Sequence, residues 1–287
     1  MSTPRIDAHQ HFWTLSRGDY GWLVPTLAPL YRDVEPAELR PLLARHAIDA
    51  TVLVQAAPTE AETRFLLAIA DAHPFVRGVV GWADLAAPDA VLRIDALAHH
   101  PALKGLRPML HDVSPDDWVD TAPIGAALDA MAARGLVFDA LVRPANLPPL
   151  LARVARHPSL AVVVDHGAKP VIGAGASARP DGDWVAAMRA LAALPNVSCK
   201  LSGLLTEAPP GADAATLRPV VEVLLACFGP RRLIWGSDWP VLTLASTYDG
   251  WLEVTADLLR DASDAERAAI MGGNAARVYR LQMEPRR

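Results

Sequence analysis

Two histidines stand one residue apart near the start of the chain, in the stretch IDAHQHFW at positions 6–13. Imidazole nitrogens bind metal ions and also act as general acids and bases, so His9 and His11 are candidates for either role. The spacing alone is weak evidence, because two polar residues of an N-terminal strand would give the same pattern. The rest of a site has to come from elsewhere in the chain.

Further polar side chains stand at the ends of short apolar runs, where a strand would stop. The run VVVDHGAKP carries His166 with Lys169 just beyond it, and the run RLIWGSDWPV carries Asp238. Burying a charged group is costly unless it is paired or used in function. Other runs end in the same way with six more candidates, namely Gln55, Trp82, Arg107, His111, Asp139 and Lys200.

Each of these residues also has a purely structural interpretation. His166 and Asp238 could cap the loops that follow them, since Asp is a common turn residue. Arg107 and Lys200 could form an ion pair inside the fold, and Asp139 could accept hydrogen bonds from loop backbone. All of these structural interpretations would have to hold at once, for residues that gather at the same end of one fold. One functional site accounts for all of them together, and we therefore favour that interpretation.

Short strand-like runs alternate with longer helical patterns from end to end. This alternation predicts an α/β fold, a (β/α)8 TIM barrel formed by a single domain over residues 1–287. A doubly wound sheet is the alternative, but GAGAS at 173–177 lies in a predicted long loop (167–182) and does not precede a helix as a phosphate loop would. The predicted strands are 5–12, 50–57, 76–85, 102–110, 136–142, 160–166, 197–203 and 232–241. The predicted helices are 36–47, 59–73, 88–99, 121–134, 146–157, 183–194 and 216–228, with one or two more after the last strand.

Side-chain alternation decides which residues of a strand face the barrel interior. His9 and His11 share a face, and if that face is inward both point into the mouth where barrel chemistry gathers. On the seventh predicted strand, the same rule turns Lys200 and Ser202 inward and leaves Cys199 facing the helices.

Composition excludes several function classes. With 27 Lys and Arg against 32 Asp and Glu the net charge is -5 and no basic run occurs, so nucleic acid is not an expected partner. Cys199 and Cys227 lack any metal-type spacing, and no signal peptide or transmembrane-length apolar run is found. We expect a cytoplasmic protein that binds a small molecule and no membrane, and whether it forms a homo-oligomer stays open.

With these residues assembled, the sequence resembles the amidohydrolase superfamily. It is most similar to the branch of small lactonases that includes sugar-acid lactonases of the L-fucono and L-rhamnono types and 2-pyrone-4,6-dicarboxylate lactonase. The matching stretches span nearly the whole chain in order: IDAHQHFW, VLVQAAP, GVVGWADL, GLRPML, VVDHGAKP, CKLSGLLTEA, GSDWPV and GNAARVY.

The resemblance implies a set of functional residues at the first, sixth and eighth strands. They fall on His9, His11, His166 and Asp238. Two-metal members of the superfamily carry a carboxylated Lys or a Glu on strand four and a His on strand five, whereas this chain has Arg107 and Asp139. The resemblance therefore implies one divalent ion, with zinc as the expected metal, on His9, His11 and Asp238 with or without His166, or no metal at all. No organic cofactor is expected.

The same resemblance implies hydrolysis of a lactone. Asp238 would take a proton from water, and His166 would help to polarise the carbonyl. One arginine and one aromatic residue suit a hydroxylated sugar lactone better than a pyrone or muconolactone. A metal-dependent decarboxylase of an aromatic acid and a ligand-binding protein without activity are the alternatives. The expected substrate-binding residues are Gln55, Trp82, Arg107, His111, Lys169 and Lys200.

Overall fold

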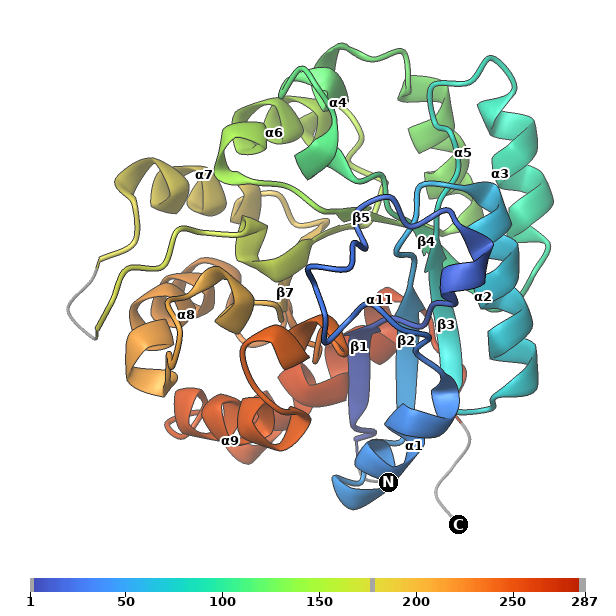
Figure 1. Ribbon diagram of the computed structural model, residues 1–287. Coiled ribbons are helices and arrows are strands. Elements are labelled where there is room, and N and C mark those ends of the chain that lie inside the picture. Colours follow the sequence, from blue (N-terminus) through green and yellow to red (C-terminus); the bar gives the residue numbers. More distant parts are fainter. Residues whose placement is uncertain (1–2, 176–178, 284–287) are drawn as a thin grey trace.

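The computed structural model describes residues 3–175 and 179–283, and its eight parallel strands form one sheet in chain order, β1 to β8 (Figure 1). The sheet closes between its first and last strands, where the amide of His11 donates to Trp239 O at 2.8 Å and the amide of Asp238 donates to His9 O at 2.7 Å. The predicted (β/α)8 barrel is confirmed. The strands are β1 Ile6–Gln10, β2 Ala50–Val54, β3 Val76–Gly81, β4 Leu103–Leu106, β5 Val137–Ala140, β6 Val162–Val164, β7 Val197–Leu201 and β8 Leu233–Trp235.

Helices surround the sheet (Figure 1). Several begin at a side chain that accepts hydrogen bonds from first-turn amides, namely Thr59, Asp181, Asp213, Thr247 and Ser263. The helices are α1 Pro36–Arg45, α2 Glu60–Ala72, α3 Ala90–Ala98, α4 Trp118–Thr121, α5 Gly125–Arg134, α6 Leu147–Ala155, α7 Gly182–Ala192, α8 Ala214–Phe228, α9 Tyr248–Leu258, α10 Asp264–Ala268 and α11 Asn274–Val278.

The helical predictions need two corrections. The helix predicted over 121–134 begins only at Gly125, as α5, because Pro123 holds the preceding Ala122 in an extended conformation with ψ of 148° and separates α5 from the short α4. After β8 the described chain has three α-helices, where one or two were predicted, and a π-helical turn at Ala269–Gly273 joins the last two. In the described residues, no helix is long and apolar enough to cross a membrane.

The predicted strands all exist, but each ends before its predicted limit, and β8 falls furthest short. β6 stops at Val164 and β8 at Trp235, whereas the predicted strands ran to 166 and 241. His166 and Asp238 have left-handed backbone conformations, with φ of 54° and 60°, which a strand cannot accommodate. Of the long loop predicted over 167–182, residues 176–178 lie outside the described part of the chain, including the end of GAGAS.

The barrel interior and the helix layer form two separate apolar clusters. Val52, Val54 and Ile234 pack inside the sheet against Tyr279, which follows α11. Cys199 belongs to the outer cluster that packs against the helices, as alternation predicted.

A β-bulge in β1 makes the histidine pair face inward. The pairing of β1 with β2 shifts register between Asp7 and Gln10. Ala8 packs in the interior cluster, and His9 next to it also lies inside, in contact with Lys200. Without this shift, strict alternation after Ala8 would direct both histidines toward the helices.

Candidate active site

A cavity of about 370 Å³ opens at the carboxyl ends of the strands. This is the end of a TIM barrel at which active sites are built. Its polar lining residues are His11, Arg107, His111, Asp112, His166, Lys169 and Asp238, and its apolar lining includes Trp22, Leu27, Met109 and Val241.

The Asp238 carboxylate lies at the centre of three imidazoles. Its Oδ1 atom is 3.3 Å from His11 Nε2, 3.7 Å from His9 Nε2 and 4.0 Å from His166 Nε2. His11 Nδ1 donates a hydrogen bond to Val54 O at 2.8 Å, and this contact directs Nε2 of the ring toward the carboxylate. His166 Nδ1 lies 2.9 Å from Ser202 Oγ. The outer nitrogens of these two rings are thus held, and their Nε2 atoms converge on one point.

Local backbone and two glycines make this convergence possible. The left-handed conformations of His166 and Asp238 turn both side chains out of strand alternation and into the mouth. A Cβ atom on Gly203 would collide with the His166 ring, and one on Gly236 would lie 2.6 Å from His9 Cβ. The glycines of the KLSG and WGSDW stretches therefore leave room for the two imidazoles.

The site holds an ionised carboxylate beside the imidazoles of His9 and His166, which are neutral at neutral pH. Burial acts to raise the pKa of Asp238, but the nearby His166 and the hydrogen bond with His11 outweigh it and hold the pKa below the ordinary 3.8. Burial lowers the pKa of His166 to about 4 and that of His9 well below 6.5. Asp238 is therefore able to accept a proton.

Beneath these groups lies a fully enclosed set of charges. Lys200 Nζ is 2.6 Å from Asp139 Oδ2, 2.9 Å from Asp165 Oδ1 and 3.1 Å from His9 Nδ1. The hydroxyl of Tyr279 donates to Asp139 Oδ2 at 2.8 Å from the opposite end of the barrel. None of the five side chains is exposed beyond 1%. The structure therefore places Lys200 below the cavity and not in its lining, although it was predicted to contact substrate.

Gln55 and Arg107 hold one another. Gln55 Nε2 donates to Arg107 O at 2.8 Å, and Arg107 Nη2 donates to Gln55 O. Arg107 Nη1 lies 3.3 Å from Asp165 Oδ2 and reaches the cavity wall, with 3% of the residue exposed. Gln55 is fully buried and does not line the cavity, so the two predicted binding residues differ in access.

The remaining predicted binding residues lie at the rim. Lys169 lines the cavity and pairs with Glu207. His111 also lines it, and burial followed by the charge of Arg107 lowers its pKa to about 3, so this ring is neutral. Trp82 lines a neighbouring cavity of about 450 Å³ that shares Trp22, Met109 and Asp112 with the first.

Four residues that shape the site were not predicted from the sequence. Ser202 positions His166, Asp165 binds both buried cations, Glu207 pairs with Lys169, and Trp22 lines the cavity. The parity of Ser202 with Lys200 was an available signal for the first. Trp22 stands in the irregular segment after β1, where no periodicity indicates direction.

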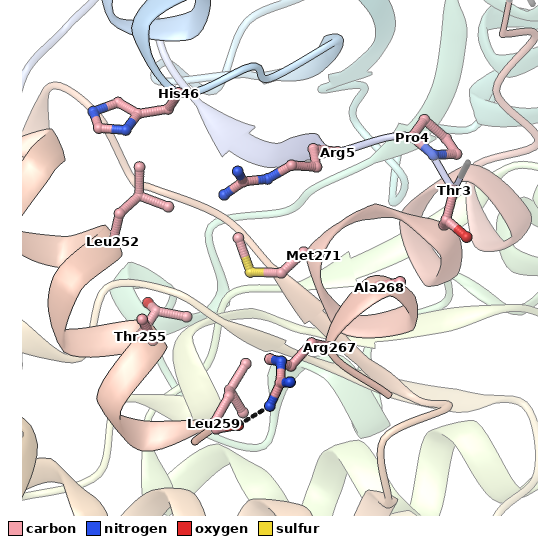
Figure 2. Close-up of a pocket in the computed structure, with 11 residues that line it drawn as sticks. Thr3, Pro4, Arg5, His46, Leu252, Thr255, Leu259, Arg267, Ala268 and Met271 are labelled. Carbon is pink, nitrogen blue, oxygen red and sulfur yellow. Dashed lines mark hydrogen bonds between the residues drawn. The ribbon is translucent and has the colours of Figure 1, made fainter. Parts of the chain in front are cut away.

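Another cavity, of about 340 Å³, lies at the opposite end of the barrel (Figure 2). It is lined by Arg5 just before β1, by His46 at the end of α1, and by Leu252 of α9 and Met271 of the π-helical turn. His9, His166 and Asp238 are absent from its lining. This cavity is therefore separate from the polar cluster.

Two groups of side chains have the geometry of a metal site. One is His9, His11 and Asp238, and the other is His9, Asp165 and His166, with ligand atoms within 4.8 Å of one another in each. The two groups share His9, and the ammonium of Lys200 lies 2.9 Å from Asp165 Oδ1. Lys200 Nζ also lies 3.1 Å from His9 Nδ1, and Arg107 Nη1 lies 3.4 Å from His9 Nε2, so cations of the chain border the ligand that both groups share. In the first group, His11 and Asp238 are the two remaining ligands, and the ammonium that contacts Asp165 lies outside it.

A family model described as Amidohydrolase matches residues 6–281. The chain belongs to the amidohydrolase family. The barrel fold and the position of the histidines and Asp238 at strand ends agree with the resemblance seen in the sequence.

Three relatives of this amidohydrolase are similar to it over nearly their whole chains. An L-fucono-1,5-lactonase of Burkholderia ambifaria is 48% identical over 285 residues, covering 97% of this chain and 96% of the relative. An L-fucono-1,5-lactonase of Burkholderia multivorans is 42% identical, with 98% and 97% covered. A crystal structure of an amidohydrolase from Burkholderia multivorans with bound Zn has a TM-score of 0.90 at 40% identity, covering 97% of this chain and 100% of that one.

Proposed function

We propose that this amidohydrolase opens the ring of a sugar-acid lactone, with a substrate of the L-fucono-1,5-lactone type. The observation that carries the proposal is the ionised Asp238 carboxylate at the cavity floor, 3.3–4.0 Å from three imidazole nitrogens. The two full-length relatives named L-fucono-1,5-lactonase support the substrate class.

A single divalent cation fits the first group of donors. His9, His11 and Asp238 would hold it, and His166 borders the same point. The held orientation of His11, with Nδ1 bound to a backbone carbonyl, is the outer contact that metal-binding histidines ordinarily make. When bound, such an ion supplies Lewis acidity for a carbonyl or a water. The Zn-bound relative supports zinc as the expected ion.

The residues of the chain can carry the proton through the reaction. Asp238 accepts a proton from the attacking water, whose oxygen forms a bond to the lactone carbonyl carbon. When the ring C–O bond breaks, protonated Asp238 returns that proton to the departing ring oxygen, and a hydroxy acid results. With the Ser202 hydroxyl donating to Nδ1, His166 carries its proton on Nε2 and donates to the carbonyl oxygen as negative charge develops there.

Recognition of the substrate falls to the residues that line the cavity. Arg107, His111 and Lys169 offer donors for ring hydroxyls, and Trp22 offers an apolar face. Gln55 and Lys200 do not line the cavity, and they hold Arg107 and His9 in place. A single lining arginine suits a neutral hydroxylated lactone better than a dicarboxylate.

A pH-indicator screen with and without chelator tests the proposal. Aldonolactones should be hydrolysed faster than muconolactones or pyrone dicarboxylates, and chelation should lower the rate if the ion is required. Release of carbon dioxide from a hydroxybenzoate, with no aldonolactone opened, would overturn the lactonase assignment. The cytoplasmic location and a homo-oligomeric state stay predictions, and gel filtration of the purified chain tests the second.

A further inference from the structure

The cavity beside the active site is larger than a single lactone ring requires. The catalytic cavity of about 370 Å³ already lies in the size range of small-molecule sites. The neighbouring cavity adds about 450 Å³ and shares three wall residues with it, Trp22, Met109 and Asp112. We call this second space the annex; its defining residues are Trp22, Trp82, Met109, Asp112 and Trp118. The annex continues the substrate cleft across the mouth of the barrel.

Three half-buried indole rings line the annex. Trp22, Trp82 and Trp118 come from three different segments, after β1, after β3 and at the start of α4. The indole N–H of Trp22 donates to Ala56 O at 2.7 Å. For Trp82 and Trp118, which both lie in the described part of the chain, no indole hydrogen bond is formed within the protein. The annex therefore offers flat apolar faces together with free donors.

The lining of the annex is more acidic than that of the catalytic cavity. Asp19, Asp84 and Asp112 are its charged lining residues, and no Lys, Arg or His is found among the described residues of its wall. The catalytic cavity combines Arg107 and Lys169 with the carboxylates of Asp112 and Asp238 in its lining. Asp19 pairs with Arg17 at 2.6 Å and Asp112 lies 3.2 Å from His111 Nε2, whereas Asp84 has no ion-pair partner among the described residues. Carboxylate oxygens accept hydrogen bonds from hydroxyls, so the annex favours a hydroxylated ligand with an apolar face.

We propose that the annex is a subsite for a second sugar ring attached to the lactone, so that the enzyme accepts glycosylated aldonolactones. A pyranose ring has an apolar C–H face for an indole and hydroxyls for the carboxylates and free N–H groups. The lactone ring would occupy the catalytic cavity beside Asp238. This inference rests on the proposed lactonase function and extends it to the substrate class.

Kinetics on two matched substrates test the subsite. Wild-type enzyme should open a disaccharide lactone, cellobiono-1,5-lactone, with kcat/KM at least equal to that for glucono-1,5-lactone. Trp118→Ala should lower kcat/KM about tenfold for the disaccharide lactone and less than twofold for the simple lactone. Trp118→Phe, which keeps a ring, should recover most of the loss. Tyr31→Ala removes a half-exposed aromatic residue outside both cavities and should leave both substrates unchanged.

Equal losses on both substrates, or turnover of the simple lactone alone by the wild type, would overturn the subsite. A preference for an alkyl lactone such as δ-decalactone over the disaccharide lactone would also overturn it, because the annex would then bind an apolar tail.

Direct binding separates failure of the subsite from failure of the lactonase proposal. With ¹⁵N-labelled enzyme, cellobionate should shift the indole N–H signals of Trp82 and Trp118, assigned with the Trp→Phe variants, whereas gluconate should leave them in place. These shifts are expected even if no lactone is hydrolysed. Unmoved indole signals at saturating cellobionate would contradict the proposal whatever the activity.

Discussion

The barrel interior contains two layers of polar side chains that differ in how completely they are paired. In the lower layer, Lys200 binds two carboxylates, and Asp139 also accepts the hydroxyl of Tyr279. In the upper layer, Asp238 faces three imidazole nitrogens at 3.3–4.0 Å and borders an open cavity. The two lower carboxylates face two cations, because Arg107 also lies 3.3 Å from Asp165 Oδ2. The upper carboxylate lacks a cationic side chain in direct contact within the described chain.

This difference separates residues that support the site from residues that react. Removing one partner of a buried ion pair strongly destabilises the folded protein, because the other charge is left alone in a medium of low polarity. An ionised group at a cavity wall keeps contact with solvent or ligand, so its removal changes chemistry more than stability. Each layer therefore predicts a different response to mutation.

Asp238→Asn should give the largest effect on the upper layer. Asn tolerates the left-handed backbone of this position, with φ of 60°, so the fold should persist. The amide cannot accept the proton from water, and we expect kcat for aldonolactone hydrolysis to fall by about 10³-fold or more. Stopped-flow indicator assays measure the loss, and Asp129→Asn at an exposed position is the control. Retention of a tenth of the wild-type kcat would show that another group is the base.

Lys200→Met should give the matching effect on the lower layer. It leaves Asp139 and Asp165 buried without their shared cation, and the free energy of unfolding should fall by about 3–5 kcal/mol in urea titrations. The same substitution at Lys169, whose ion pair with Glu207 is partly exposed, should cost less than about 1 kcal/mol. Adding Asp139→Asn to Lys200→Met should recover part of the stability. Equal losses at the two lysines would contradict the difference between the layers.

The sequence could identify the strand ends that carry polar groups, but not the layer to which each side chain belongs. Periodicity predicted the barrel and placed His166 and Asp238 at the correct strand ends. Lys200 and Gln55 showed the same signal, yet both are enclosed, because pairing between distant strands decides access. The bulge in β1, which turns His9 inward, depends on pairing with β2 and has no local signature.

Glu62→Gln should sharpen the comparison, because Glu62 is a buried carboxylate satisfied mainly by neutral donors. Burial raises its pKa to about 7, although the Tyr20 hydroxyl at 2.6 Å, the Ala56 amide and Arg17 act to lower it and Asp19 to raise it. In Asp165, by contrast, Lys200 leads the groups that overcome burial and hold the pKa below 3.8. Lys200 and Arg107 thus help to keep the pKa of Asp165 low, whereas the mainly neutral donors around Glu62 leave its pKa raised.

The sign of the expected pH dependence follows from the raised pKa. The folded state binds the Glu62 proton more tightly than the unfolded state, so the stability contribution is complete below pH 4.5 and is lost as pH rises through about 7. Between pH 5 and pH 8, the free energy of unfolding of the wild type should fall by about 2–3 kcal/mol relative to Glu62→Gln, which cannot ionise. A constant difference across this range in urea titrations would show that Glu62 stays ionised in the folded protein.

Ser202→Ala should give the smallest effect, and it tests whether the upper layer also depends on held orientation. The substitution removes the contact at 2.9 Å that fixes the outer nitrogen of His166, while Gly203 still leaves room for the ring. The hydrogen bond is worth about 1 kcal/mol, so kcat should fall about three- to tenfold. A positioning role predicts that KM for the aldonolactone changes less than twofold and that Ser202→Thr, which keeps the hydroxyl, restores kcat. If Ser202→Ala instead lowers only the unfolding free energy and leaves kcat intact, His166 is oriented by packing alone, and the two layers differ in charge pairing but not in geometric control.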